Sequence, residues 1–582
     1  YEWSAYDEII DNLSVNWYLT DYLTLKGQFS VTKQYTDTER FYDPLSSKVS
    51  VYGTDETNLQ GDLYTTDGGS LSWNANAFAY YTRSFGKHNF NFSGGWEAAA
   101  YNVDNTSAHY RGFPSGEFNS LNYAAEVYKK PTRSENTTRR VSILATLNYT
   151  WNDVYLADAS VRFDGSSEFG ANQKWAPFFS GGLGLNIHNY DFLKGNKDVN
   201  KLKVRASYGR TGKVNFPAYA ATTMYEALFD EWYITGYGVT LKALGNKDLS
   251  WDKFNVGLET QFFDRRLTVD FDYYYEKTID LINDVTLSNT SGFSTYKNNM
   301  GEVENKGVEL QVRADVYRDR DWTIALWGNM AHNKNRILKI SESQKAYNER
   351  VMEFYREELK NQDLYKNALA NAEYAIPIPQ YSEGQSLTSI WAVRSLGIDP
   401  TTGEELFLNR DGSITDKWDP AQEVVVGNTE PKLNGSIGLN ATYKNWSLFA
   451  AFQYEFGGQE YNQTLVNRVE NADIKGGNVD LRVLTDRWQK PGDVAQFKNI
   501  ANSNLTTLPT SRFVQDKKYI RLSSVTLSYD FNREWIKKHL HMNMLRFEVS
   551  SSDFINWNSI RQERGLSYPK SWKIDFSLKA QF

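Results

Sequence analysis

Histidine and cysteine often supply acid–base, metal-binding or nucleophilic groups, and this sequence uses them sparingly. It has no cysteine, which excludes thiolate metal ligands, disulfides and a cysteine nucleophile. Its histidines are scattered, without HExxH spacing, at His88, His109, His188, His332, His539 and His541. Only the last two are close, and a solvated turn explains that pair better than a metal site. The spacing indicates no enzyme and no cofactor, although a Ser/His or Asp/His site built from distant segments has no signature in spacing.

The segment from Asn409 to Asp416 (NRDGSITD) has a faint calcium-loop pattern. Asp411, Gly412 and Asp416 are suitably placed, but a calcium loop of the EF-hand type needs oxygen ligands at several further fixed positions. Arg410 and the missing terminal Glu break that pattern. We therefore expect an exposed hairpin with an Asp-Gly turn and no metal ligand at this segment.

Aromatic and arginine side chains in polar segments are better candidates for recognising a ligand. Aromatic faces stack on sugar rings and bury peptide side chains, and guanidinium groups bind anions. For each residue taken singly, the alternative is structural packing or a solvated charge. The candidate contacts with a substrate or a partner are Trp232, Tyr233, Tyr237, Trp391, Arg394, Trp418, Tyr461, Arg487 and Trp488.

Apolar residues alternate with polar ones over long stretches, as in β-strands with one apolar face. One stretch begins at Val141, Ile143 and Ala145, turns at Asn152-Asp153 and resumes at Tyr155. The same unit recurs with turns predicted at Asp21-Tyr22, Gly86-Lys87, Asp264-Arg265, Arg320-Asp321 and Lys444-Asn445. The predicted strands run about 9–14 residues, and we count about seventeen of them.

Composition separates two classes of all-β protein. The 582 residues are 15% aromatic, yet the mean hydropathy is −0.60. In a transmembrane β-barrel only alternate residues face lipid and aromatic girdles mark both interfaces, so a polar average and many rings occur together. No apolar run approaches the ~20 residues of a membrane-spanning helix. A net charge of −7 argues against nucleic-acid binding.

Short and long connections alternate strictly along the chain. The long ones are polar segments near 36–70, 102–140, 210–252, 334–432 and 459–517. Tight turns on one side and long loops on the other are typical of an outer-membrane barrel, whose short side is periplasmic. A soluble propeller would instead repeat a four-stranded unit at near-constant spacing. We therefore predict an all-β, antiparallel transmembrane β-barrel with long extracellular loops.

Strand direction leads to an expectation about the whole protein. If the last strand, 571–582, descends to the periplasm, every predicted tight turn is periplasmic and the first strand also descends. A closed bacterial barrel with periplasmic termini has an even number of strands. We therefore expect at least one strand upstream of Tyr1, and we interpret 1–582 as the C-terminal portion of a larger barrel. Phe582, which ends the last alternating strand, resembles the aromatic signal read by the barrel-assembly machinery.

Ten sequence phrases, taken in order, resemble one family of membrane transporters. They are VRFDGSSEFG (161–170), WAPFFSGGLGLNI (175–187), LKVRASYGRTG (202–212), NKDLSWDKFNVGLETQFFDRRLTVDFDYYYEKTIDLI (246–282), NMGEVENKGVEL (299–310), GIDPTTGE (397–404), GNTEPKLNGSIGL (427–439), DRWQKPGD (486–493), YIRLSSVTLSYDF (519–531) and GLSYPKSWKIDFSLKAQF (565–582). Through them, the chain resembles the SusC-like branch of the TonB-dependent outer-membrane transporters of Bacteroidetes.

The resemblance implies a barrel of about 22 strands, roughly 17 of which lie in this chain. It also implies a plug domain and a TonB-contacting segment, neither of which this chain contains. The implied function is TonB-powered import of a large nutrient, an oligosaccharide or a peptide, across the outer membrane. A SusD-like surface lipoprotein would act as a lid. Two alternatives stay open: a passive porin, and a barrel component of a surface assembly or secretion machine that imports no cargo.

The longest predicted loop contains a helical pattern from about Glu342 to Ala372. Its apolar residues fall near the i, i+3, i+4 spacing of an amphipathic helix at Val351, Phe354, Tyr355, Leu359 and Leu364. The apolar face has two interpretations, packing against its own loop or docking against a partner lid.

Overall fold

The computed structural model of the chain is almost entirely β-structure. It describes residues 1–49, 59–167, 175–211, 224–233, 236–243, 250–279, 282–286, 295–299, 301–340, 342–360, 376–472, 474, 479–502, 506–531, 533–553, 555–561 and 571–581. Eighteen of the described strands belong to one antiparallel sheet. The chain divides into two compact units: unit 1 is Tyr1–Leu183, Gly209–Ser250 and Thr286–Lys297, and unit 2 is Gly184–Tyr208, Trp251–Val285 and Asn298–Phe582.

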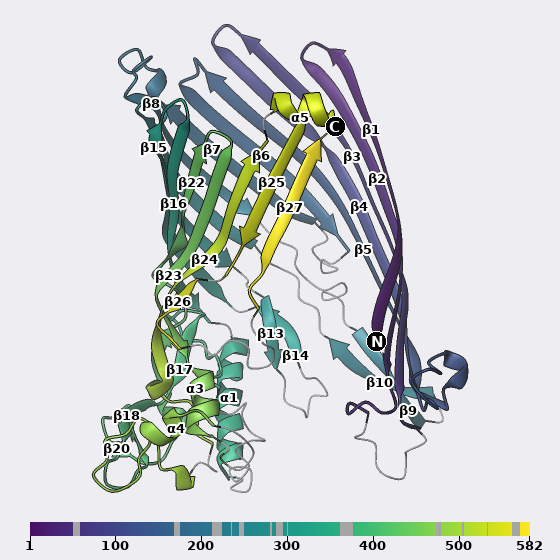
Figure 1. Cartoon of the computed structure of the whole chain (residues 1–582), viewed down its shortest axis with the longest axis vertical. Coiled ribbons are helices and arrows are strands. Elements are labelled where there is room, and N and C mark those ends of the chain that lie inside the picture. Colours follow the sequence, from purple (N-terminus) through teal and green to yellow (C-terminus); the bar gives the residue numbers. More distant parts are fainter. Residues whose placement is uncertain are drawn as a thin grey trace. The chain divides into compact units, whose positions relative to one another are not determined.

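Unit 1 is a meander in which β1 to β6 pair in chain order (Figure 1). The strands are β1 (Glu2–Thr20), β2 (Leu23–Tyr42), β3 (Asp62–Phe85), β4 (His88–Arg111), β5 (Glu126–Trp151), β6 (Tyr155–Ser166) and most of β7 (Trp175–Asn186). A 3₁₀-helix, η2 (Leu121–Tyr123), follows β4, and a separate hairpin is formed by β9 (Met224–Tyr233) and β10 (Gly236–Ala243).

The first two long connections are shorter than the sequence predicted. Part of the segment expected at 36–70 is strand, because β2 continues to Tyr42 and β3 begins at Asp62. The strands β4 and β5 extend into the segment expected at 102–140 in the same way. Outside the membrane neither face of a strand has to meet lipid, so the backbone pairing can continue where the apolar alternation ends.

Unit 2 contains the remaining strands of the sheet. They are most of β8 (Val199–Thr211), then β11 (Ser250–Phe262), β12 (Leu267–Ile279), β15 (Glu302–Arg318), β16 (Trp322–Lys339), β22 (Leu433–Tyr443), β23 (Trp446–Tyr461), β24 (Val514–Asp530), β25 (Met544–Ser551), β26 (Asn556–Asn558) and β27 (Ile574–Gln581). The 3₁₀-helix η3 (Ile187–Asn189) precedes β8, and β13 (Ile282–Thr286) pairs with β14 (Thr295–Asn299) in a separate sheet. Because β25 and β26 both pair with β24, they are one interrupted strand. The 18 strands of the sheet thus occupy seventeen positions, which confirms the predicted number.

Tight turns connect the hairpins at the predicted places. Positive φ angles occur at Gly86, Asn152, Asp153, Asp264, Arg265 and Lys444. Two-residue hairpin turns commonly use this left-handed backbone, because its twist then matches the twist of the flanking strands. Gly, Asn and Asp adopt it at least cost, which explains why these residues marked the turns in the sequence.

The two sides of the unit 2 sheet differ in chemistry. On one side apolar residues lie beside each other, as Leu326 of β16 does with Leu439 of β22, and Leu326 is 48% exposed. On the other side Asn329 of β16 lies beside Gln311 and Ser436. An apolar side open to the surroundings and a polar opposite side are the arrangement of a membrane barrel wall, whose apolar side faces lipid. The opposite side is called the polar face below.

The connections after β16 and after β23 fold together into a layer that we call the loop subdomain (the described residues of 342–428 and 462–513). Its elements are α1 (Glu342–Lys360), β17 (Ser389–Ala392), β18 (Arg394–Ile398), β19 (Glu405–Leu408), β20 (Ile414–Thr415), η6 (Pro420–Gln422), β21 (Val424–Asn428), α3 (Gln463–Leu465), the π-helical turn η7 (Val466–Glu470), α4 (Arg482–Thr485), η8 (Ile500–Asn502) and η9 (Ser511–Phe513). None of the helices in the described part of the chain is long and apolar enough to cross a membrane.

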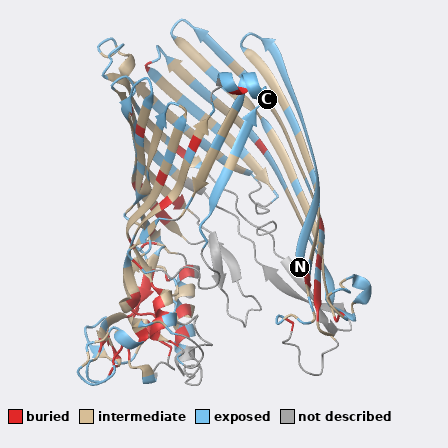
Figure 2. Cartoon of the chain, in the orientation of Figure 1, coloured by how far each residue is buried: buried red, intermediate tan, exposed pale blue. Residues whose placement is uncertain are grey.

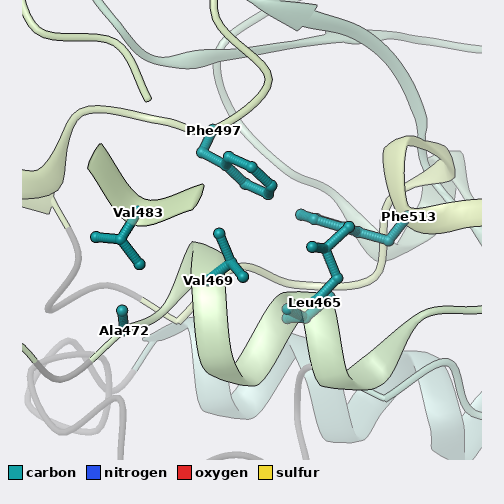
Figure 3. Close-up of a cluster of buried hydrophobic side chains, with 7 residues drawn as sticks. Leu465, Val469, Ala472, Val483, Phe497 and Phe513 are labelled. Atoms are coloured by element: carbon teal, nitrogen blue, oxygen red, sulfur yellow. The ribbon is translucent and has the colours of Figure 1, made fainter. Parts of the chain in front are cut away.

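Buried residues concentrate in the loop subdomain (Figure 2). Figure 3 shows its larger cluster, formed by Leu465, Val466, Val469, Ala472, Val483, Phe497 and Phe513. A second cluster joins Val351 and Tyr355 of α1 to Leu508. Since buried apolar surface is the main stabilising contribution to a fold, these two connections form a folded body rather than extended loops.

Candidate functional site

Hydrogen bonds join the two chain segments of the loop subdomain. Val393 donates its amide to the carbonyl oxygen of Pro509 at 3.2 Å, and its own carbonyl accepts from the amide of Ser511 at 2.9 Å. The indole Nε1 of Trp418 also donates to the Pro509 carbonyl, at 2.9 Å. The Ser511 hydroxyl accepts from the amide of Ser395 at 2.9 Å. The segment before β22 and the segment after β23 are therefore connected along their backbones.

A buried ion network strengthens this connection. Arg512 donates from Nη2 to Glu405 Oε2 at 2.8 Å and to Glu470 Oε1 at 2.6 Å. The three side chains are only 11%, 7% and 0% exposed, respectively. Thr510 and Thr507 donate their hydroxyls to Glu405 and Glu470, at 2.6 and 3.2 Å. One guanidinium thus serves two buried carboxylates, one from each segment of the subdomain.

Burial changes the pKa of several groups in the loop subdomain. Burial opposes ionisation of Glu470, but the Arg512 guanidinium outweighs it and holds the pKa of this carboxyl below its usual value. Burial lowers the pKa of Lys498 to about 8. Burial raises the pKa of Glu423 to about 8, which a hydrogen bond from Gln380 only partly offsets. The other oxygen of Glu423, Oε1, is buried without a hydrogen bond to any described residue, so protonation is favoured there.

Three predicted contact residues from the first segment are packed in the loop subdomain. Trp391 of β17 is 9% exposed. Arg394 of β18 donates from Nη2 to the carbonyl oxygen of Asn409 at 3.1 Å. Trp418 packs edge-on against Tyr355, with ring centroids 5.1 Å apart. In this conformation the three side chains support the subdomain, and their contact with a ligand stays a prediction.

Two predicted residues from the second segment are also packed. Tyr461, at the end of β23, packs edge-on against Phe513 with ring centroids 6.0 Å apart. Arg487 is 5% exposed, and its guanidinium donates to the carbonyl oxygens of Val469, Glu470 and Lys498. Such backbone contacts fix the path of a loop, so a structural role for Arg487 is visible without a ligand.

Trp488 connects two of the quoted sequence phrases, 397–404 and 486–493. Its Nε1 donates to the carbonyl oxygen of Pro400 at 2.9 Å. Its ring covers Gly403, where an added Cβ would lie 2.6 Å from the ring atoms. Gly403 also has a φ of 75°, which an L side chain rarely adopts. Glycine at this position therefore allows both the turn and the approach of Trp488.

The other predicted site residues have no described side chain. Trp232 of β9 pairs with Tyr237 of β10, and Tyr233 pairs with Gly236, which places these three predicted residues on one hairpin within the segment 210–252. Their side chains lie outside the described residues. Phe582, predicted to be the assembly signal, also lies outside them.

The apolar face of α1 packs against its own subdomain. Val351 is 6% exposed and Tyr355 is 1% exposed, and both belong to one buried cluster with Leu508. Of the two interpretations of this helix, packing is confirmed for these residues. Phe354 is 40% exposed and its ring packs edge-on against Tyr355, with ring centroids 5.6 Å apart, so docking of this residue against a lid stays a prediction. The predicted apolar residue Leu364 lies outside the described part of the chain.

A separate polar cavity of about 350 Å³ lies on the polar face of unit 2, between β12, β15, β16 and β22. The strand registers bring Asp270 beside Gln311, Asp272 beside Glu309, and Gln311 beside Asn329. The polar residues that line the cavity are Asp270, Asp272, Glu309, Gln311, Asn329 and Asn434. Carboxylates and carboxamides of this kind bind the hydroxyl, amide and ammonium groups of sugars and peptides.

The carboxylates of this cavity differ in their partners. Arg205 of β8 donates from Nη2 to both oxygens of Asp272, at 2.7 and 2.9 Å, and from Nε to Glu259 at 2.9 Å. Glu309 is exposed, and within the described ranges neither Asp270 nor Glu309 forms a side-chain hydrogen bond or an ion pair. These two carboxylates are therefore free to bind a ligand.

An amide cluster further along the same strands connects the wall to the loop subdomain. Asn335 donates from Nδ2 to Asn305 Oδ1 at 2.8 Å and accepts at Oδ1 from the amide of Leu387, also at 2.8 Å. Glu430 accepts from the Asn335 amide at 3.1 Å and from the side chain of Asn333. The first loop segment is therefore held on the polar face at Leu387.

The sequence alone does not identify the residues that line the cavity, although several of them stand at polar positions of the predicted strands. Glu309 stands at a polar position of the phrase at 299–310, and Asp270 and Asp272 stand at polar positions of β12. Any polar residue on such a strand is equally explained by solvation. Only the strand register shows which side chains lie together.

The described residues offer no group of three or more His, Asp or Glu side chains that could hold a metal ion. In the segment 409–416, Asp411 Oδ1 accepts from the amide and the hydroxyl of Ser413, at 2.9 and 2.7 Å. Gly412 has a φ of 87°, and β19 pairs with β20. The predicted hairpin with an Asp-Gly turn is confirmed.

The sheet, its two chemically different sides and its tight turns define an outer-membrane β-barrel wall. Residues 2–550 match the family described as TonB dependent receptor-like, beta-barrel. The chain belongs to this family, and it is an integral outer-membrane protein of a transporter class rather than an enzyme.

Curated relatives confirm the resemblance to the SusC-like branch. The TonB-dependent receptor P3 of Formosa agariphila is 27% identical over 490 residues, which cover 82% of this chain and 47% of that protein. The TonB-dependent receptor SusC of Bacteroides thetaiotaomicron is 25% identical over 485 residues, which cover 79% of this chain and 44% of that protein. The chain thus spans about half the length of the curated relatives it matches.

Solved structures show the same fold. The RagAB peptide transporter matches with a TM-score of 0.79 at 23% identity, covering 96% of this chain and 59% of that chain. The RagAB peptide importer in its open-open state matches with a TM-score of 0.80 at 21% identity, covering 100% of this chain and 62% of that chain. Similarity at these identities establishes the β-barrel architecture.

Proposed function

We propose that the whole protein imports a large nutrient, an oligosaccharide or a peptide, across the outer membrane with energy supplied through TonB. The family supports the transport mechanism, since this chain belongs to the TonB-dependent receptors. The resemblance to the SusC-like branch supports a SusD-like surface lipoprotein as partner, and residues 1–582 as the C-terminal portion of the barrel. TonB would be contacted by another segment of the protein.

The polar cavity is the observation in this chain that best supports the proposed import. Within the part of the chain that the structure describes, Asp270 and Glu309 form no side-chain hydrogen bond or ion pair, and they stand on the face that a solute passes in a barrel. A transported molecule must bind and then leave, so hydrogen-bonding groups on a wall suit transport better than a closed pocket. Hydroxyl-rich sugars and peptide amides both offer donors to these carboxylates.

The nine predicted loop residues stay candidates for contact with substrate or lid. For Trp391, Arg487 and Trp488, which are buried in the loop subdomain, contact requires a conformational change. Trp232, Tyr233 and Tyr237 share one hairpin, so three of the nine candidates come from one short stretch of backbone.

The proposal is tested with the full-length protein in its native outer membrane. Molecules that co-purify with it are identified by mass spectrometry, and a labelled form of the bound sugar or peptide is used to measure uptake. Uptake should depend on TonB and should fall on the order of ten-fold in D270N/E309Q, because two charged hydrogen-bond acceptors are lost. The variant D530N/E548Q removes the same charge from strands that do not line the cavity, and it should retain uptake.

Two results would contradict the proposal. Uptake that continues without TonB would indicate a passive porin. Absence of any bound molecule, together with co-purification of several surface lipoproteins not of the SusD type, would indicate a component of an assembly or secretion machine.

A further inference from the structure

A short helix, α5 (Arg533–Leu540), joins β24 to β25 at the end of the strands opposite the loop subdomain (Figure 1). At this end, tight turns connect other hairpins of unit 2, as at Lys444 between β22 and β23, whereas the connection between β7 and β8 contains η3. Ile536 anchors the helix and is only 1% exposed, whereas Trp535 and Leu540 are 51% and 40% exposed. A polar turn would have sufficed for the connection, so the exposed apolar side chains call for an explanation.

The exposed surface of α5 is basic. Lys537 and Lys538 stand in its last turn and are exposed. Within the described part of the chain, neither lysine lies within ion-pair distance of a carboxylate. The whole chain has a net charge of −7, so the positive charge of two adjacent unpaired lysines differs from the average charge of the chain. They form a local site for anions.

Aromatic side chains lead along the wall to this helix. At the tight-turn end of unit 2, Trp446 packs against Tyr529 with ring centroids 4.8 Å apart, and Tyr529 packs against Phe531 at 5.1 Å. These rings belong to the apolar side of the sheet, and such rings mark the level of the lipid headgroups. Trp535 follows Phe531 by only four residues, so α5 begins where the lipid-facing girdle ends.

We propose that α5 lies in the headgroup layer of the periplasmic leaflet and binds anionic phospholipid. Trp535 would sit at the boundary between headgroups and acyl chains, where its amphipathic ring is favoured. Lys537 and Lys538 would pair with headgroup phosphates. Continuity with the girdle favours lipid over a periplasmic protein as the occupant, because the same rings already fix the membrane level beside the helix.

The expected strength follows from interfacial electrostatics. A lysine near an anionic membrane surface contributes roughly five-fold to binding, so the two lysines together contribute on the order of twenty-five-fold. The effect should weaken as the salt concentration rises, because exposed charges are screened.

Lipid selection is measured with the full-length protein in nanodiscs that contain equal amounts of phosphatidylcholine and phosphatidylglycerol. Native mass spectrometry gives the ratio of the two lipids that stay bound. The ratio should favour phosphatidylglycerol in the natural protein and should fall at least ten-fold in K537Q/K538Q. The variant K417Q/K490Q removes the same charge from exposed lysines of the loop subdomain and should leave the ratio unchanged. Equal ratios in the natural protein and K537Q/K538Q would overturn the proposal.

A second measurement places the helix directly. Brominated phosphatidylglycerol quenches tryptophan fluorescence on contact, and the difference between the natural protein and W535F isolates the signal of Trp535. That signal should be quenched in brominated nanodiscs. An unquenched signal would overturn the proposal. Co-purification of a periplasmic protein would also overturn it, in favour of a protein partner, if K537Q/K538Q abolishes that co-purification and leaves lipid binding unchanged.

Discussion

Glu423 is a carboxyl held in the loop subdomain without a strong cationic partner, and it should make the stability of the subdomain depend on pH. Burial raises its pKa from 4.5 to about 8. The folded state therefore keeps the proton over a range in which the unfolded state has released it. Stability should fall as the pH rises from 4.5 to 8, by about 1.4 kcal/mol per pH unit, and should not fall further above 8 for this group.

Glu423→Gln tests this prediction because the amide keeps the shape of the carboxyl and cannot ionise. The variant should resist thermolysin better than the natural protein at pH 8 and equally well at pH 5. Glu349→Gln, at an exposed position of α1, serves as the control and should change neither value. An equal effect of E423Q at both pH values would show that Glu423 is ionised in the folded state.

Single residues also show the limit of reasoning from residue type. As loop aromatics, Trp418 and Trp488 are candidate ligand contacts, and in the structure both donate their indole N–H to a proline carbonyl in the other loop segment. A buried tryptophan needs such an acceptor, so packing and recognition use the same residue type. The sequence shows the tryptophan but does not show which distant carbonyl oxygen will accept its N–H. The fold brings the two together.

At the scale of elements, the alternation of apolar residues predicts the parts of the strands that lie inside the membrane. It does not predict the parts that continue outside the membrane. Alternation located the hairpin turn at Asn152-Asp153, and the positive φ angles of both residues confirm it. The same reasoning placed a loop at 36–70, where β2 in fact continues to Tyr42. Within lipid an unpaired or wrongly turned strand is costly, so the pattern is strict. In water no such constraint acts on the side chains.

The contact between Trp488 and Gly403 gives a prediction for the stability of the loop subdomain. Gly403→Ala should destabilise the loop subdomain by about 2 kcal/mol or more, since it combines an unfavourable positive φ with a Cβ 2.6 Å from the Trp488 ring. Gly412→Ala is the matched control: its φ is 87°, but nothing lies within 4 Å of the added Cβ. It should cost only about 1 kcal/mol. Hydrogen exchange of the 486–493 amides measures both, and equal effects would show that the ring moves aside freely.

At the scale of the molecule, unit 2 combines two kinds of stability. Its strand wall is held by backbone hydrogen bonds that have no substitute in lipid. Its loop subdomain is held by buried clusters, and by Arg512 bound to Glu405 and Glu470. Bodies stabilised by different interactions need not unfold together. The loop subdomain should therefore unfold at a lower temperature than the wall.

Heating the full-length protein in nanodiscs should accordingly expose the amides of η7 and η9 to hydrogen exchange before those of β22 and β23. Arg512→Gln should lower the first transition alone, because it leaves two buried carboxylates without their guanidinium at a cost of about 3–5 kcal/mol. Arg482→Gln breaks a pair with Asp480, two residues away in the same segment, and should cost at most about 1 kcal/mol. One cooperative transition for all four elements, or a wall that also melts early in R512Q, would mean that the ion network stabilises unit 2 as a whole. A first transition at low temperature that is confined to the loop subdomain would show that the two connections can open while the wall stays folded. The proposed contact of their buried aromatic residues with a substrate requires such an opening.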